Sequence, residues 1–419
     1  MLNHNKHYSL RASVIFIAIL SFSFPFTGAG LHNLLFWLAI IFFGLSGNYR
    51  QATKLVRDEP VIRSGLFLFG FLSLSLIWHG ASAESFAWLM KYKEFLLLPI
   101  LVSILSQKNS QNLVVTSFLI GLLLTLYASY FIYFDLFRPN GNWNSLNARI
   151  LHGLQMNVLL SFALYQIISK QKWRIFWSIT SLLIITNLII MEPGRTSQIM
   201  LVLNTLFFVF LSGKKINLAK KIVMLLAILT VSVLVAKYTD IRTLNNKSHF
   251  DSSSITFSYG KSSTLPYPHN VFEDHLSIRN LDNRAAFYIN GLHLIINKPF
   301  GGYGLGNTGL AYEKLKNAQA TYGMQDIYPT TVNLHQQLLQ ISTEVGLLGG
   351  VLFVLFVYRL LRFAIEAKNP LVFSVFLITA IQTSFNSSFL DHGDGWVLML
   401  IIALAISYKN SMAKSTSGF

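Results

Sequence analysis

The sequence of 419 residues contains no cysteine and few charged residues. The absence of cysteine excludes disulfide bonds, thiolate metal ligands and a cysteine nucleophile. Charged residues make up 12% of the chain, whereas hydrophobic residues make up 53%. An ordinary soluble domain carries about twice that charged fraction. The composition therefore predicts a chain that lies largely in a membrane.

Acidic residues are scarce as well: 17 Asp and Glu stand against 33 Lys and Arg, a net charge of +16. Such an excess can indicate binding to nucleic acid. Here the basic residues lie mainly in short loops between apolar runs, as the positive-inside rule predicts for membrane proteins. No basic run is interleaved with aromatic residues in a polar segment. We therefore expect membrane lipids, and no nucleic acid, as partners.

Long apolar runs recur along the whole chain, and they are continuous rather than alternating. Since only helices and closed barrels satisfy the backbone in hydrocarbon, such runs predict transmembrane helices. We expect an all-α polytopic membrane protein with about 12 spans, the first an uncleaved helix. The expected spans cover residues 10–27, 31–47, 65–79, 85–106, 112–135, 151–169, 175–191, 195–212, 222–237, 337–358, 371–389 and 396–408.

The pattern divides the chain into three parts. Residues 1–237 hold spans 1 to 9, residues 238–336 form one large polar loop, and residues 337–419 hold the last three spans and the C-terminus. Loops rich in Lys and Arg are assigned to the cytoplasm, so the large loop is periplasmic. In it, residues 282–297 have helical periodicity, and Pro299 ends this helix before a flexible glycine-rich turn.

A histidine, His335, stands where the large loop meets the span over 337–358. With an ordinary pKa near ~6.5, an imidazole can act as a base or as a charged donor near neutral pH. Glu344 lies nine residues further on, about 900° around a helix, so it is on the opposite face and is no local partner. The alternative is an interfacial histidine that is satisfied by water or by a neighbouring amide.

Two arginines at helix starts are candidates for binding an anion. Arg195 follows Pro193-Gly194 and opens a span at the outer face, where a guanidinium fork and backbone amides can hold phosphate oxygens. Arg284 lies in the first turn of the outer-loop helix, where a cation is unfavourable unless an anion compensates it. The alternatives are an arginine that reaches the lipid headgroups and a solvated surface charge.

Lys91 and Lys93 lie inside an apolar run, where charges usually face a cavity or a partner. Either they form a basic wall for a lipid phosphate, or Lys93 pairs with Glu94. The glycine-rich turn at 301–306 follows no strand, so it is not a dinucleotide-binding loop; it can shape a substrate groove. We find no metal-ligand constellation and no nucleotide-binding loop, and we expect no metal and no cofactor.

The segment from Asn333 to Gly349 resembles the signature of the bacterial O-antigen ligases. In this signature a histidine and an amide residue precede two glycines of an apolar helix, here His335-Gln336, Gly346 and Gly349. The family often has Asn at the second position. The longer glutamine side chain could mark a polymerase or another acceptor.

Two more motifs resemble the same family and occur in its order. Gly194-Arg195-Thr196-Ser197 opens a span, and Arg284 is followed by the run Asn297-Lys298-Pro299-Phe300-Gly301-Gly302-Tyr303-Gly304. These motifs lie within residues 190–350, whereas the similarity in topology covers the whole chain.

The resemblance implies a GT-C-like glycosyltransferase of the bacterial inner membrane with its active site facing the periplasm. It implies transfer of a polysaccharide from undecaprenyl diphosphate to lipid A–core in lipopolysaccharide biosynthesis, with inversion and without a metal. His335 would be catalytic, and Arg195 and Arg284 would bind the diphosphate. Further expected substrate-binding residues are Lys91, Lys93, Gln336 and Tyr303.

Other activities remain open. An O-antigen polymerase of the same superfamily would join repeat units to one another. A protein-glycosylating transferase fits less well, because such members usually carry longer C-terminal portions. A transporter or flippase for a lipid-linked sugar would also use basic residues in a cavity, but it would not need a histidine beside two arginines.

Overall fold

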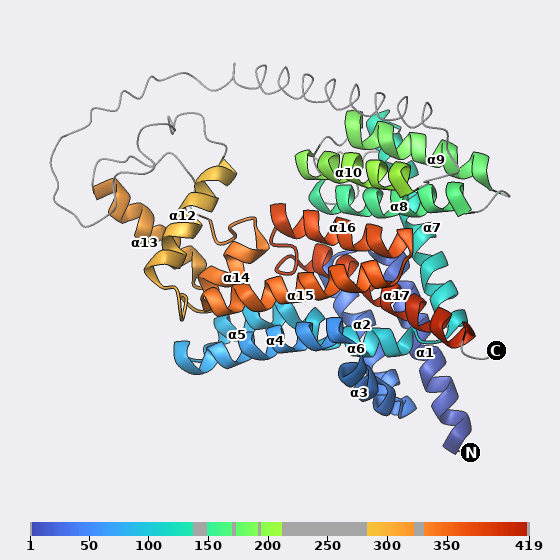
Figure 1. Cartoon of the computed structure of the whole chain (residues 1–419), viewed down its shortest axis with the longest axis horizontal. Coiled ribbons are helices and arrows are strands. Elements are labelled where there is room, and N and C mark those ends of the chain that lie inside the picture. Colours follow the sequence, from blue (N-terminus) through green and yellow to red (C-terminus); the bar gives the residue numbers. More distant parts are fainter. Residues whose placement is uncertain are drawn as a thin grey trace.

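The computed structural model describes residues 2–136, 149–169, 173–191, 194–211, 283–321 and 331–416 (Figure 1). Every regular element in this part of the chain is a helix, which confirms the expected all-α fold. The first elements are α1 (Leu2–Ser23), α2 (Ala29–Ser46), α3 (Tyr49–Asp58), α4 (Pro60–His79), α5 (Ala83–Leu89), the 3-10 turn η1 (Met90–Tyr92), α6 (Lys93–Ile104) and α7 (Lys108–Tyr133). Next come α8 (Arg149–Ser169), α9 (Arg174–Thr186), the π-helical turn η2 (Asn187–Met191), α10 (Arg195–Leu211), α12 (Asn283–Asn297) and α13 (Thr308–Thr321). The last are α14 (Gln337–Val345), α15 (Leu347–Glu366), α16 (Pro370–Phe385) and α17 (His392–Thr416).

Five described segments are long and apolar enough to cross a membrane. They are Pro60–His79, Lys108–Tyr133, Ile150–Ser169, Arg174–Met191 and Leu347–Glu366. The pair α2 and α3, bent by 102°, adds a sixth if it is counted as one span, and α10 and α16 are apolar but shorter. A polytopic membrane protein is thereby confirmed. The count of twelve spans stays a prediction, and the expected span over 222–237 lies outside the described residues.

Two expected spans are broken helices, so the continuous helices predicted there are wrong. The run over 85–106 folds as α5, η1 and α6, with the break at Met90–Tyr92. The run over 337–358 is divided into α14 and α15 at Gly346, which has φ 84°. A Cβ at Gly346 would lie 2.5 Å from the carbonyl oxygen of Phe300. Hydrophobic periodicity carries no signal for such a backbone conformation.

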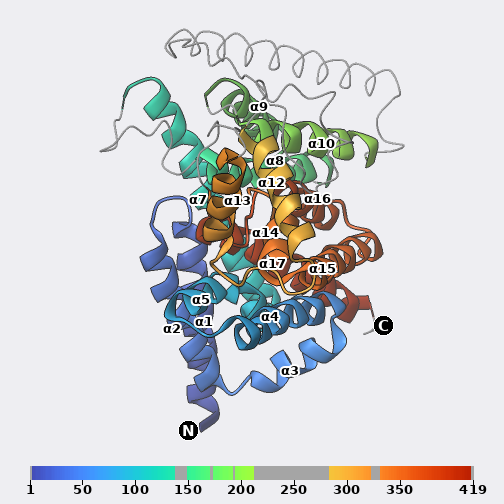
Figure 2. The same cartoon turned by 90° about the vertical axis from the view of Figure 1, so that its left-hand side faces the viewer.

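The helices form two groups that share one core (Figures 1 and 2). In the first group, α4 packs against α15 and α6, and α6 packs against α17. Phe95 of α6 anchors this group, with its ring centroid 5.1 Å from that of Phe356 and 4.8 Å from that of Phe389. In the second group, α8 packs against α9, α10 and α16. Figure 1 shows α12 and α13 at the left-hand end of the molecule, beyond α14, and in Figure 2, which is viewed from that end, they lie in front.

Polar side chains join the helices of the second group. The Ser374 hydroxyl of α16 lies 2.8 Å from Asn204 Oδ1 of α10 and 2.7 Å from Ser161 Oγ of α8. All three side chains are buried. Interhelical hydrogen bonds of this kind hold helices together where lipid supplies no hydrophobic driving force.

The glycine-rich turn after α12 is fixed on the C-terminal end of α14. The backbone N–H groups of Tyr303 and Gly304 donate to the carbonyl oxygens of Thr343 (2.9 Å) and Glu344 (2.8 Å). The Leu347 N–H donates to the Pro299 oxygen at 2.7 Å. These bonds satisfy carbonyl groups that a helix end leaves unpaired. The flexible turn expected from the sequence is therefore a docked one.

We predict that Gly302→Ala destabilises the protein and that Gly301→Ala does not. Gly302 has φ 69°, and a Cβ there would lie 2.5 Å from the Glu344 oxygen. A Cβ at Gly301 would meet nothing within 4 Å. The loss at Gly302 should exceed about 1 kcal/mol, measured as a lower Tm in detergent. Equal Tm values for the two variants would show that the turn is not docked in this way.

Candidate functional site

His335 adopts a backbone conformation that is rare for a residue other than glycine. Its φ is 54°, in the left-handed region, which costs a side-chain-bearing residue about 1–3 kcal/mol. Two hydrogen bonds hold it there. The His335 N–H donates to Asn333 Oδ1 at 2.8 Å, and the Tyr288 hydroxyl donates to the His335 carbonyl oxygen at 3.3 Å. Strained residues of this kind cluster at functional sites.

The imidazole of His335 is oriented by stacking and is half-buried. It lies parallel to the Phe287 ring of α12, with the ring centroids 5.7 Å apart and an angle of 29° between the planes. Phe287 itself belongs to a small apolar cluster under the loop, together with Leu334 and Tyr312. One face of the ring is therefore held by Phe287, while the residue as a whole keeps part of its surface exposed.

Gln336 is the N-cap of α14. Its side-chain oxygen accepts a hydrogen bond from the Leu339 N–H, which satisfies one of the free amides at the helix start. An amide residue after the histidine is therefore needed to begin the helix at this point. Its expected role in substrate binding stays a prediction.

A buried chain of hydrogen bonds runs below His335. Gln340 Oε1 accepts from the Leu334 N–H at 2.9 Å, and Gln340 Nε2 donates to Glu344 Oε1 at 2.9 Å. The Tyr92 hydroxyl of η1 donates to Glu344 Oε2 at 3.0 Å. Gln340, Glu344 and Tyr92 are fully buried, and so is Leu334. A buried N–H that loses its acceptor costs about 1–3 kcal/mol, as much as the strain at His335.

The surroundings of the Glu344 carboxyl change its pKa. Glu344 lies on the short helix α14, which ends before the span that begins at Leu347. Burial raises the pKa of Glu344 from the ordinary 4.5 to about 7. The hydrogen bonds from Gln340 and Tyr92, and the positive charge of Lys91, limit the rise. The carboxyl is thus close to half-protonated near neutral pH.

The two lysines of the broken helix lie in different surroundings. The Lys91 ammonium stands 3.7 Å above the Trp88 ring, and Trp88 packs closely on Gly306 of the glycine turn. The positive charge of Lys91 also acts on Glu344. Lys93 Nζ lies 4.0 Å from a Glu94 carboxyl oxygen, and both side chains are buried. The ion pair that the sequence offered as an alternative is present.

The remaining expected residues are divided between the two helix groups. Tyr303 lies in the docked turn, next to the apolar cluster under His335, and Arg284 is in α12, three residues before Phe287. Arg195 is exposed at the start of α10, which packs against α8, η2 and α16. The fold thus groups His335 with Tyr303 and with the helix of Arg284. Arg195 belongs to the neighbouring group, which reaches α14 through α16.

Sequence reasoning missed several residues of this region. His79, the last residue of α4, has its Nε2 2.7 Å from the Gly301 carbonyl oxygen, and no sequence pattern links the two. A signal did exist for the buried chain. Gln336, Gln340 and Glu344 recur at intervals of four, which places three polar side chains along one helix face.

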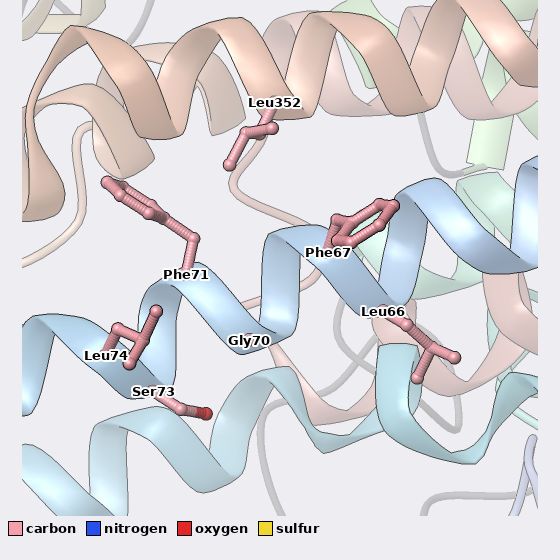
Figure 3. Close-up of a pocket in the computed structure, with 7 residues that line it drawn as sticks. All are labelled: Leu66, Phe67, Gly70, Phe71, Ser73, Leu74 and Leu352. Atoms are coloured by element: carbon pink, nitrogen blue, oxygen red, sulfur yellow. The ribbon is translucent and has the colours of Figure 1, made fainter.

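An apolar groove lies between α4 and α15, the two helices that lead into this region (Figure 3). Its volume is about 580 Å³. It is lined by Leu66, Phe67, Gly70, Phe71, Ser73, Leu74 and Leu352. Such a lining suits a hydrocarbon chain rather than a sugar. Within the described residues, no group of three His, Asp or Glu side chains could hold a metal ion.

Comparison with known proteins shows what this region is similar to. Residues 179–354 match the family described as O-antigen ligase, a segment that includes α10, α12 and α14. The matched segment contains all three motifs that resemble this family in the sequence. It is also 32% identical, over 97 residues, to a Rickettsia typhi protein named a polysaccharide ligase. This alignment covers 23% of the chain and 24% of that relative.

We predict a pH-dependent stability that Glu344→Gln removes. Between pH 4.5 and about 7 the folded protein keeps a proton on Glu344 that the unfolded chain has released. The free energy of unfolding therefore falls as the pH rises through this window and is level above it. The measurement is the Tm of both proteins in detergent from pH 4.5 to 8. The wild type should lose stability relative to Glu344→Gln; parallel curves would contradict the assignment.

Proposed function

We propose that the protein is an O-antigen ligase. It transfers a polysaccharide from undecaprenyl diphosphate to a sugar hydroxyl of lipid A–core, at the periplasmic face of the bacterial inner membrane. The observation that carries this proposal is the strained and stacked His335 at the start of α14, inside the segment that matches the O-antigen ligase family. The name of the Rickettsia typhi relative supports the same class of reaction.

In the proposed reaction the acceptor hydroxyl oxygen attacks the anomeric carbon of the donor sugar. The bond from that carbon to the diphosphate oxygen breaks, the configuration inverts, and His335 takes the hydroxyl proton. A half-buried imidazole suits this role, because its ordinary pKa lies near the operating pH. Stacking on Phe287 holds the ring in one orientation, so the imidazole loses little conformational entropy when the acceptor binds.

The diphosphate leaves with additional negative charge, and we assign its stabilisation to Arg195 and Arg284. A guanidinium holds phosphate oxygens through two parallel hydrogen bonds, and a helix start adds backbone N–H groups. Both arginines stand in the first turn of a helix, α10 and α12. Lys91, whose ammonium stands over the Trp88 ring beside the glycine turn, would supply a third positive charge. The apolar groove along α4 and α15 suits the lipid part of a substrate.

An O-antigen polymerase is the second candidate, because Gln336 replaces the Asn that ligases often carry after the histidine. The two enzymes share the donor and the leaving group, and they differ in the acceptor. Analysis of the lipid products therefore separates them. A transporter for lipid-linked sugar would form no bond, so turnover of both lipid substrates by the purified protein would exclude it.

We predict that His335→Asn abolishes ligation and keeps the fold. Asn tolerates the left-handed conformation, so the backbone is preserved while the base is lost. Activity should fall by about 10²–10⁴-fold. Cells should make lipopolysaccharide with bare core and accumulate lipid-linked polymer, with Val332→Ala as the control in the same loop. Cores capped by single repeats would indicate a polymerase, and normal capping would remove His335 from the mechanism.

We predict that Arg195→Lys loses most of the activity although the charge is kept. Lysine offers a point charge in place of the two-pronged guanidinium, so the developing charge on the diphosphate is held less well. Arg195→Ala should lose about a hundredfold in kcat, equal to about 3 kcal/mol. The measurement is turnover by purified protein with lipid-linked donor and lipid A–core. Full activity of Arg195→Lys would mean that a point charge suffices.

A further inference from the structure

The side chain of Gln340 connects the loop of His335 to the interior of the protein. Its oxygen accepts from the N–H of Leu334, the residue directly before His335. Its nitrogen donates to Glu344 Oε1 and, at 3.2 Å, to the Thr308 hydroxyl of α13. The amide thus connects the loop of His335, α13 and Glu344 of its own helix, and its side chain is fully buried.

Glu344 determines which way the Gln340 amide points. Its two carboxyl oxygens accept from Gln340 Nε2 and from the Tyr92 hydroxyl. If the amide were reversed, its oxygen would face the Glu344 carboxyl and its NH₂ would face the Leu334 N–H. The contact with the Leu334 N–H would then be repulsive, and so would the contact with Glu344 whenever its carboxyl is ionised. Only the observed orientation gives Leu334 an acceptor.

This orientation bears directly on the conformation of His335. The left-handed backbone there is unfavourable, and the loop is held on both sides of it. Asn333 holds the His335 N–H on the side of the loop, and Gln340 holds the Leu334 N–H on the side of the core. The second bond restrains the Asn333–Leu334 peptide from the side of the core, and through it the position of the His335 ring on Phe287.

We propose that Gln340, oriented by Glu344, is a positioning residue for His335. The proposal rests on the proposed role of His335 as the base. It assigns Gln340 no contact with the donor or the acceptor. Its effect is on the rate of the chemical step, because a displacement of about 1 Å at a catalytic group reduces the rate by about a hundredfold.

The test is a double-mutant cycle on the purified full chain, with lipid-linked donor and lipid A–core acceptor. We expect Gln340→Met to lower kcat by about 10–100-fold and to leave the KM for both substrates within about twofold. We expect the double variant His335→Asn/Gln340→Met to be no slower than His335→Asn, because the group that Gln340 positions is already absent. A residue that only supports the fold would slow both backgrounds equally.

Glu344 supplies a matched pair of variants. Glu344→Gln keeps an oxygen that accepts from Gln340 and should retain most of the wild-type kcat. Glu344→Leu removes the acceptor and should lose as much as Gln340→Met. If Gln340→Met does not fold, Thr308→Val removes a single bond to the same amide nitrogen and enters the cycle in its place, with a smaller loss of about 3–10-fold.

The outcomes separate the two proposals. The positioning role would be overturned if the losses of the two single variants multiplied in the double variant, or if Gln340→Met had a wild-type kcat. In either case an inactive His335→Asn would still support the proposed function. Wild-type activity of His335→Asn would overturn both. Equal losses for Glu344→Gln and Glu344→Leu would show that the amide is not oriented through this hydrogen bond.

Discussion

The structure depends on the docking of one turn on one helix end. Backbone N–H groups of the turn at 299–306 meet the carbonyl oxygens that α14 leaves unpaired, and Leu347 closes the contact in the opposite direction. This contact divides the expected span at Gly346 and sets α14 apart from α15. It brings α12, and with it Phe287, against the loop of His335. The glycines with positive φ are the condition for this close approach.

A fully buried carboxyl then links this docked region to the broken helix of the N-terminal part. Glu344 accepts hydrogen bonds from the Tyr92 hydroxyl of η1 and from the Gln340 amide of its own helix. The positive charge of Lys91 also acts on it. A buried chain of hydrogen bonds contributes little net stability, but breaking any one of them leaves an unsatisfied polar group and destabilises the protein. Such a chain specifies one arrangement of the loop, which a catalytic imidazole requires.

The helical fold and the position of His335 could be predicted from the sequence. The helix breaks and the partners of Glu344 could not, for physical reasons. Continuous apolar runs gave the helices, and the residues around His335 indicated the family. Periodicity could not show the breaks at Met90–Tyr92 and Gly346, because apolar residues resume after each break, and polar residues such as Lys91 and Glu344 do not by themselves end a helix. The helical spacing places Glu344 on the face opposite His335, but it does not show which residue of another helix Glu344 contacts. Contacts between residues 252 positions apart, such as Tyr92 and Glu344, leave no local pattern.

The hydrogen bonds among Ser161, Asn204 and Ser374 have a consequence for biogenesis. α10 and α16 carry buried polar groups within apolar helices, and such groups make insertion of each helix into lipid by itself less favourable. Ser374 is synthesised 170 residues after Asn204, the residue that it contacts. Until then, Asn204 of α10 can bond only with the Ser161 hydroxyl of α8 among these three residues. The polar contact of α8, α10 and α16 is therefore complete only after α16 has been synthesised.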